Sequence, residues 1–193
     1  MRRAVFVDRD GVINEMVPSP EGPDSPRNVG EFRLIAGAAR AIRSLNALGF
    51  PVVVVSNQPG IAKGKLSAED LDAMTALMRS TLNEQEAVID GLYYCLHHPQ
   101  AVLPSYRTVC ECRKPKPGLL TMAADEMRLS LTGSYMVGDQ PRDVIAGKTA
   151  GCTTLFVSSG GEENAPSGAD FLCADLASAA SLIAQLEAST AVH

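Results

Sequence analysis

The sequence predicts a three-layer α/β fold, with a Rossmann-like parallel sheet between two layers of helices. Short apolar runs rich in β-branched residues alternate with segments whose apolar residues recur at helical spacing, an order typical of successive βαβ units. Residues 52–55 are all valine, without polar alternation, which is typical of a strand buried on both faces of a parallel sheet. The chain has 193 residues, a length that suits one compact domain.

The elements follow from these runs and from the residues that begin and end helices. Strands are expected at 4–7, 51–55, 89–94, 135–137 and 153–157. Helices are expected at 38–48, 67–82, 118–127, 141–150 and 175–186. Gly49 and Gly151 end the first and the fourth helix, because glycine readily adopts the left-handed conformation found there. Ser67 and Asp70 resemble a capping box, with a shortened acid, at the start of the second helix.

We expect one domain over residues 1–187, followed by a disordered tail at 188–193. Two longer segments interrupt the alternation of strands and helices: 14–31 is rich in proline, glycine and charge, and 95–117 is rich in cysteine, histidine and proline. Neither is long enough for a large cap domain. Long loops on a rigid scaffold often carry function, so both are expected to shape a binding site.

The composition narrows the classes of function. With 46% hydrophobic residues the chain is not a disordered tail protein, and its net charge of −5 lacks the positive field of nonspecific nucleic-acid binding. The first apolar run ends at Asp8, too early for a secretory signal, and no segment approaches bilayer length. Five cysteines are too few for a disulfide scaffold and favour a reducing compartment. We therefore expect a cytoplasmic monomer without nucleic-acid or membrane partners, acting on a small anionic molecule.

Two carboxylates, Asp8 and Asp10, follow the first strand directly and precede Gly11. In an extended chain this spacing points both to one side, where like charges are costly without a cation or a shared proton. The pair therefore indicates a Mg²⁺ site with a nucleophile and a general acid; solvated turn acids are the alternative. Ser56 and Asn57 end the second strand and could hydrogen-bond a phosphate oxygen.

These residues predict more about function when they are considered together. In an open parallel sheet the carboxyl ends of the strands share one edge, where ligands bind. Asp139 follows the strand at 135–137 and should join the first two acids there, while Arg113 and Lys114 precede a helix and could add positive charge. Asp143 falls in the first turn of a helix, where the helix dipole favours an acid, and a structural role is expected for it. Three carboxylates with a lysine and hydroxyl or amide donors favour Mg²⁺-dependent phosphoryl transfer.

A second cluster predicts a structural zinc site in a loop at 95–112. Its expected ligands are Cys95, His97, Cys110 and Cys112. Three thiolates and one imidazole complete a tetrahedral shell with no open position, as in structural zinc sites. His98 is an alternative to His97, and four unrelated buried residues are the alternative to a metal site. Cys152 and Cys173 are expected to be ordinary core residues.

Four motifs, D-R-D-G-V-I-N, S-N-Q, R-K-P-K-P-G and G-D-Q-P-R-D, together resemble the haloacid dehalogenase superfamily of phosphatases, over residues 8–151. The resemblance implies that Asp8 forms an aspartyl-phosphate and that Asp10 protonates the leaving alkoxide and then activates water. It implies a Mg²⁺ site made by Asp8, Asp139 and the carbonyl of Asp10. The substrate-binding residues that we expect are Ser56, Asn57, Gln58, Arg113, Lys114 and Gln140.

Within that superfamily, C-x-H-H-P followed by C-x-C-R-K-P-x-P-G resembles the branch that removes the 7-phosphate of D-glycero-D-manno-heptose 1,7-bisphosphate in bacterial nucleotide-heptose synthesis. The histidinol-phosphatases share much of this pattern and are the enzymatic alternative. Arg113 and Lys116 favour a substrate with a second anionic group. A zinc-stabilised binding module without catalysis is the alternative from another class, and the intact set of acids with Lys114 counts against it.

Overall fold

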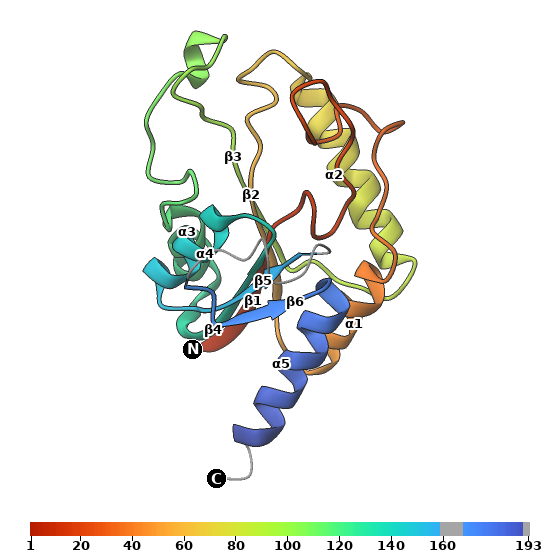
Figure 1. The fold of residues 1–193 in the computed structure, drawn as a ribbon, viewed down its shortest axis with the longest axis vertical. Coiled ribbons are helices and arrows are strands. Elements are labelled where there is room, and N and C mark those ends of the chain that lie inside the picture. Colours follow the sequence, from red (N-terminus) through yellow and green to blue (C-terminus); the bar gives the residue numbers. More distant parts are fainter. Residues whose placement is uncertain (159–167, 191–193) are drawn as a thin grey trace.

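The computed structural model describes residues 1–158 and 168–190 and has three layers, as predicted (Figure 1). A six-stranded sheet has the order β3-β2-β1-β4-β5-β6, and all its strand pairs are parallel. The strands are β1 (Arg2–Val7), β2 (Val52–Asn57), β3 (Gly91–Cys95), β4 (Leu129–Gly138), β5 (Thr153–Val157) and β6 (Phe171–Cys173). The helices are α1 (Ala38–Ala47), α2 (Ala68–Asn83), α3 (Gly118–Met127), α4 (Pro141–Ala150) and α5 (Leu176–Thr190). A short 3₁₀ turn (Pro104–Tyr106) lies in the loop after β3.

The helices divide between the two faces of the sheet. One core packs α1, α2 and α5 against one face, and a second core packs α3 and α4 against the other. Val52 and Val54 of β2 belong to the first core, whereas Val53 and Val55 belong to the second. Successive side chains of a strand point to opposite faces, so a run of valines fills both cores.

The helix ends largely follow the predicted signals. Ser67 and Asp70 form the capping box of α2, because the Ser67 hydroxyl accepts from the Asp70 amide and the Asp70 carboxylate accepts from the Ser67 amide, each at 3.0 Å. Gly151 ends α4 in the left-handed conformation, with φ of 85°. No helix among residues 1–158 and 168–190 is long and apolar enough to cross a membrane.

The largest departures from the predicted elements are at β4, β6 and α5. Strand β4 begins at Leu129 rather than at 135, because its polar first half pairs with Arg2 and Arg3 before the register shifts. Strand β6 was not predicted, since three residues are too few to show a periodic pattern. Helix α5 continues to Thr190, three residues into the expected tail at 188–193; residues 191–193 lie outside the described part of the chain.

The core predicts a clear contrast between two isoleucines. Ile42 of α1 is fully buried, and Ile145 of α4 is 52% exposed. Ile42→Ala should lower the free energy of unfolding by about 2–5 kcal/mol, because it removes buried methyl groups and leaves a cavity. The matched change Ile145→Ala should stay within about 0.5 kcal/mol of the parent protein. Urea unfolding followed by circular dichroism measures both, and equal losses would show that the assigned core is wrong.

Candidate active site and cysteine cluster

Carboxylates from three elements meet at the carboxyl edge of the sheet. Asp8 follows β1, Asp139 follows β4, and Asp143 lies in the first turn of α4. One carboxylate oxygen of each lies within 4.8 Å of the others. The convergence of Asp8 and Asp139 is the one expected from the parallel sheet.

Lys114 is the cation of this group, and its side chain is completely buried. Its Nζ lies 3.1 Å from Oδ1 of Asp8 and 2.6 Å from Oδ1 of Asp143, and donates to the carbonyl of Val55 at 2.8 Å. Burial lowers the pKa of Lys114, but Asp143 and Asp8 more than offset this effect, and the pKa is raised overall. The ammonium group therefore stays charged between the two acids.

Asp143 has a larger part in this group than its position in a helix suggested. Asp143 contacts Lys114 through Oδ1, and its Oδ2 accepts a hydrogen bond at 3.0 Å from the backbone N–H of Gln140. This second contact caps α4. A Cβ at Gly138 would lie 2.3 Å from the Cβ of Asp143, so the strand end can approach the helix only as glycine. The sequence indicated this role only through spacing. Asp143 follows Asp139 by four residues, so it lies in the first turn of the helix, next to the edge of the sheet.

The acid group fits a hard cation with oxygen ligands. Oδ2 of Asp139 accepts from Nε2 of Gln140 at 3.0 Å, while Oδ1 is buried and bonds to no described residue. Burial, followed by the charge of Asp8, raises the pKa of Asp139 to about 7. A Cβ at Gly11, whose φ is +80°, would lie 2.3 Å from Oδ2 of Asp139. Three neighbouring acids, two of them paired with Lys114 and all beside the open backbone at Gly11, could hold Mg²⁺.

The carboxylate of Asp10 lies outside this group of three and is held by its own set of donors. Its Oδ1 accepts from Nε of Arg9 and from Nδ2 of Asn14, both at 2.9 Å. Its Oδ2 accepts from the Ser25 hydroxyl at 2.8 Å and from Nε2 of Gln58 at 2.7 Å. The carboxylate therefore has a fixed orientation at the rim of the acid group.

Several predicted substrate-binding residues bond to other site residues. Nδ2 of Asn57 donates to the carbonyl of Lys114 and its Oδ1 accepts from the Lys114 amide, both at 3.0 Å. The side-chain amide of Gln58 donates to the hydroxyl of Ser56 at 3.2 Å, in addition to its bond to Asp10. Arg113 donates to the carbonyl of His97 at 3.2 Å. These contacts give Asn57, Gln58 and Arg113 positioning roles that residue type and spacing alone did not indicate.

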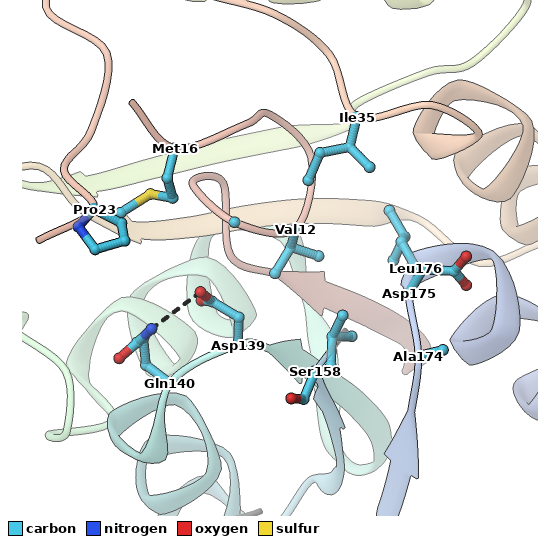
Figure 2. A pocket seen from close by; sticks show the side chains of 12 residues that line it. Val12, Met16, Pro23, Ile35, Asp139, Gln140, Ser158, Ala174, Asp175 and Leu176 are labelled. Atoms are coloured by element: carbon cyan, nitrogen blue, oxygen red, sulfur yellow. Dashed lines mark hydrogen bonds between the residues drawn. The ribbon is translucent and has the colours of Figure 1, made fainter. Parts of the chain in front are cut away.

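A cavity of about 620 Å³ opens beside Asp139 and Gln140 (Figure 2). Its apolar lining includes Val12 and Met16 of the loop after β1 and Leu176 at the start of α5. Asp175 adds a second carboxylate, and none of the described residues that line the cavity is a lysine or an arginine. The cavity is large enough for part of a small substrate.

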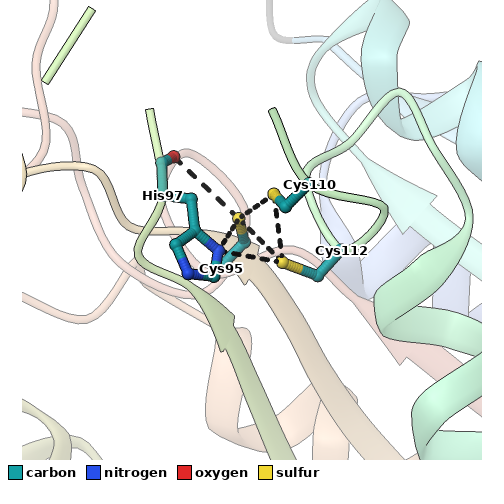
Figure 3. Close-up of side chains that lie close together, drawn as sticks. All are labelled: Cys95, His97, Cys110 and Cys112. Atoms are coloured by element: carbon teal, nitrogen blue, oxygen red, sulfur yellow. Dashed lines mark hydrogen bonds between the residues drawn. The ribbon is translucent and has the colours of Figure 1, made fainter. Parts of the chain in front are cut away.

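The predicted zinc ligands also come together (Figure 3). The three Sγ atoms lie 3.6 Å (Cys95 to Cys110), 3.2 Å (Cys95 to Cys112) and 3.3 Å (Cys110 to Cys112) apart. Nδ1 of His97 lies 3.4 Å from Sγ of Cys112. Ligand atoms on a tetrahedral zinc with bonds of about 2.0–2.3 Å are roughly 3.5–3.8 Å apart. The four separations here are at or somewhat below that range, so a small outward shift of the side chains would let all four bind one zinc ion.

His98 points to a different environment from His97. Its Nδ1 accepts from the Gln100 amide at 3.1 Å, and burial, Arg113 and Lys63 lower its pKa. Cys152 and Cys173 are buried and lie outside the cluster. The structure therefore brings together the four residues expected from the sequence, with His97 as the histidine.

Comparisons with known proteins point to one family. A family model described as HAD-hydrolase-like matches residues 111–179. The D-glycero-beta-D-manno-heptose-1,7-bisphosphate 7-phosphatase of Escherichia coli K12 is 38% identical over 163 residues, which are 84% of this chain and 82% of that protein. The enzyme of the same name from Vibrio cholerae is 37% identical over 158 residues, or 81% of this chain and 82% of its own.

A solved structure agrees with these relatives. It is the D,D-heptose 1,7-bisphosphate phosphatase from B. bronchiseptica, complexed with magnesium and phosphate. It superposes with a TM-score of 0.80 at 30% identity, and the alignment covers 95% of this chain and 99% of that one.

Proposed function

This chain belongs to the haloacid dehalogenase-like phosphatases, and on that premise we propose that it removes the 7-phosphate of D-glycero-D-manno-heptose 1,7-bisphosphate with Mg²⁺ as cofactor. The observation that carries the proposal is the buried Lys114 between Asp8 and Asp143, beside a third acid, Asp139. The choice of substrate rests on the relatives named above, and the proposed chemistry rests on the residues of the site.

The hydrolysis takes two displacements at phosphorus. A carboxylate oxygen of Asp8 attacks phosphorus, and the bond to the sugar oxygen breaks as Asp10 gives that oxygen a proton. Asp10 then takes a proton from water, whose oxygen attacks the phosphorus of the aspartyl-phosphate and releases Asp8. A covalent intermediate divides one difficult step into two easier ones, and a positioned acid assists the departure of an alkoxide.

The other residues balance charge and hold the phosphoryl group. Lys114 offsets the charge on Asp8 and on the phosphoryl oxygens, since its Nζ lies 3.1 Å from Asp8. The hydroxyl of Ser56 is available to a phosphoryl oxygen at the end of β2. Asp8, Asp139 and the carbonyl of Asp10 would hold Mg²⁺, with Asp143 close by, and the bound ion would supply charge neutralisation for the phosphoryl group.

Cations near the site support a substrate with a second phosphate. Arg27, Lys63 and Lys65 line a small cavity between the 14–31 segment and the residues after β2. Arg113 and Lys116 line another at the cysteine cluster. A histidinol-phosphate phosphatase is the second candidate, because Asp139 and Asp175 line the large cavity without a described cation and would suit a positively charged leaving group.

We also propose that Cys95, His97, Cys110 and Cys112 hold a structural zinc ion. Such a site has no open position, so the metal supplies stability and no chemistry. The last ligand lies two residues before Lys114, and the metal would fix the segment that carries this lysine. All five cysteines are free, and a reducing compartment such as the cytoplasm would keep the ligands from forming disulfides.

The first prediction from the proposed function tests catalysis. The purified protein with Mg²⁺ should release phosphate from p-nitrophenyl phosphate, and Asp8→Asn should lower the rate by at least about 10³-fold, because the variant lacks the attacking carboxylate. Release of nitrophenolate gives both rates. A wild-type rate no higher than that of Asp8→Asn would favour a zinc-stabilised binding module.

The second prediction concerns the substrate. The value of kcat/KM for D-glycero-D-manno-heptose 1,7-bisphosphate should exceed that for histidinol phosphate by at least about tenfold, because the second phosphate can form charge-assisted hydrogen bonds with the basic residues. Phosphate release under identical conditions measures both. A preference for histidinol phosphate would replace the proposed substrate and leave the phosphatase chemistry intact.

The third prediction concerns the cysteine cluster. Cys110→Ser should lose bound zinc and lower activity by about tenfold or more, because the opened site no longer fixes the segment around Lys114. Metal analysis and phosphate release on the same sample measure the two effects. Cys152→Ser is the matched control, since this buried thiol lies outside the cluster, and its zinc content should not change. Full zinc content in Cys110→Ser would mean that the ligand set is wrong.

A further inference from the structure

We propose that Ser25 is a positioning residue for Asp10, so that the 14–31 segment takes part in proton transfer to the leaving group. The inference rests on the proposed function, in which Asp10 is the acid. It assigns a reaction step to a segment that the sequence marked only as a long loop beside the pocket.

The contacts of Asp10 carry the proposal. Arg9 and Asn14, which bond to Oδ1, belong to the same turn of chain as Asp10. Oδ2 accepts from Gln58, which follows β2, and from Ser25, fifteen residues along the chain from Asp10. Among the described residues of the 14–31 segment, only Asn14 at its start and Ser25 in its second half bond to the Asp10 carboxylate. Ser25 thus connects the second half of the segment to the acid.

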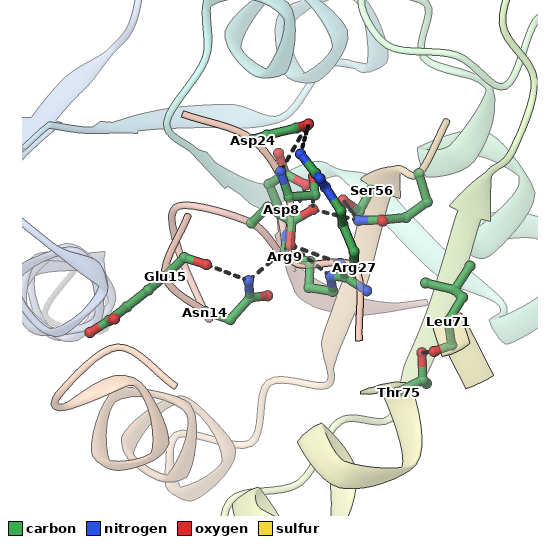
Figure 4. Close-up of polar contacts among 12 residues, drawn as sticks. Asp8, Arg9, Asn14, Glu15, Asp24, Arg27, Ser56, Leu71 and Thr75 are labelled. Atoms are coloured by element: carbon green, nitrogen blue, oxygen red, sulfur yellow. Dashed lines mark hydrogen bonds and ion pairs between the residues drawn. The ribbon is translucent and has the colours of Figure 1, made fainter. Parts of the chain in front are cut away.

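The segment holds Ser25 in place through its neighbour Asp24. The backbones of Val17 and Asp24 bond to each other in both directions, at 2.8 and 2.9 Å, and close a small hairpin. Oδ1 of Asp24 accepts from the Ser25 amide at 3.0 Å, and Oδ2 pairs with Nζ of Lys65 at 2.5 Å. Asp24 and Arg27 are drawn with Arg9 and Ser56 in Figure 4. The Asp24–Lys65 ion pair therefore joins the hairpin to the residues after β2, and Ser25, which directly follows the hairpin, points its hydroxyl at Oδ2 of Asp10.

The hydroxyl differs in kind from the other groups around Asp10. Arg9, Asn14 and Gln58 present N–H donors to the carboxylate, whereas a serine hydroxyl can donate a hydrogen bond or accept one. Ser25 can therefore remain bonded to Asp10 in both protonation states. Its O–H donates to Oδ2 of the carboxylate, and when Oδ2 carries a proton the hydroxyl can donate to the remaining lone pair of Oδ2 while that proton is directed at the leaving oxygen. This contact can hold one orientation of the acid through both displacements.

The test compares two esters whose leaving groups need a proton to different degrees. The heptose bisphosphate releases a basic alkoxide, whereas p-nitrophenyl phosphate releases a phenolate that departs unprotonated. Ser25→Ala should lower kcat/KM for the sugar ester by about tenfold and for the aryl ester by less than about twofold, because kcat/KM reports the steps through the first displacement. Ser25→Thr, which keeps a hydroxyl, should restore most of the loss.

Ser19→Ala is the matched control in the same segment. The Ser19 hydroxyl donates to the carbonyl of Gly22 at 2.6 Å and makes no contact with Asp10, so the ratio of the two kcat/KM values should not change. Equal losses on both esters in Ser25→Ala, or no loss on either, would overturn the positioning role and leave the phosphatase proposal standing. A wild-type protein that cleaves neither ester would overturn both.

Discussion

The ion pairs of a buried lysine hold this site together. Lys114 draws Asp8 of the first strand's end and Asp143 of α4 to one point, and its Nζ also bonds to the carbonyl of Val55 in β2. Burying a charged group costs free energy that only close partners and hydrogen bonds offset, and leaving one partner alone typically costs about 3–5 kcal/mol. The geometry that suits phosphoryl transfer is therefore also a condition for a stable sheet edge.

The support of Lys114 extends well beyond its own side chain. Its backbone amide and carbonyl both bond to Asn57, the last residue of β2, and Cys112 lies two residues earlier in the chain. Arg113, between them, bonds to the carbonyl of His97. The cysteine cluster and the end of β2 thus fix one short piece of chain from two sides, although this piece contains little apolar surface of its own.

The parallel sheet explains how much of this could be predicted from sequence. Parallel strands share one carboxyl edge, so the meeting of Asp8, Asp139 and Lys114 followed from their order, and paired cysteine spacing was enough to group the four residues of the cluster. The role of Asp143 could not be separated from ordinary helix capping, because one residue performs both tasks. The contacts of Asn57 and Gln58 depend on side-chain orientation in turns, which residue type and spacing leave open.

The two glycines at the acid group limit where this enzyme can vary. Gly11 and Gly138 sit so close to Asp139 and Asp143 that any side chain would displace a carboxylate. Changes of specificity are then confined to the loops around the edge. The 14–31 segment itself can be replaced by the corresponding loop of another enzyme only if that loop keeps a hydroxyl at the position of Ser25. A loop without this hydroxyl would change the wall of the pocket and would also remove one of the hydrogen bonds of Asp10.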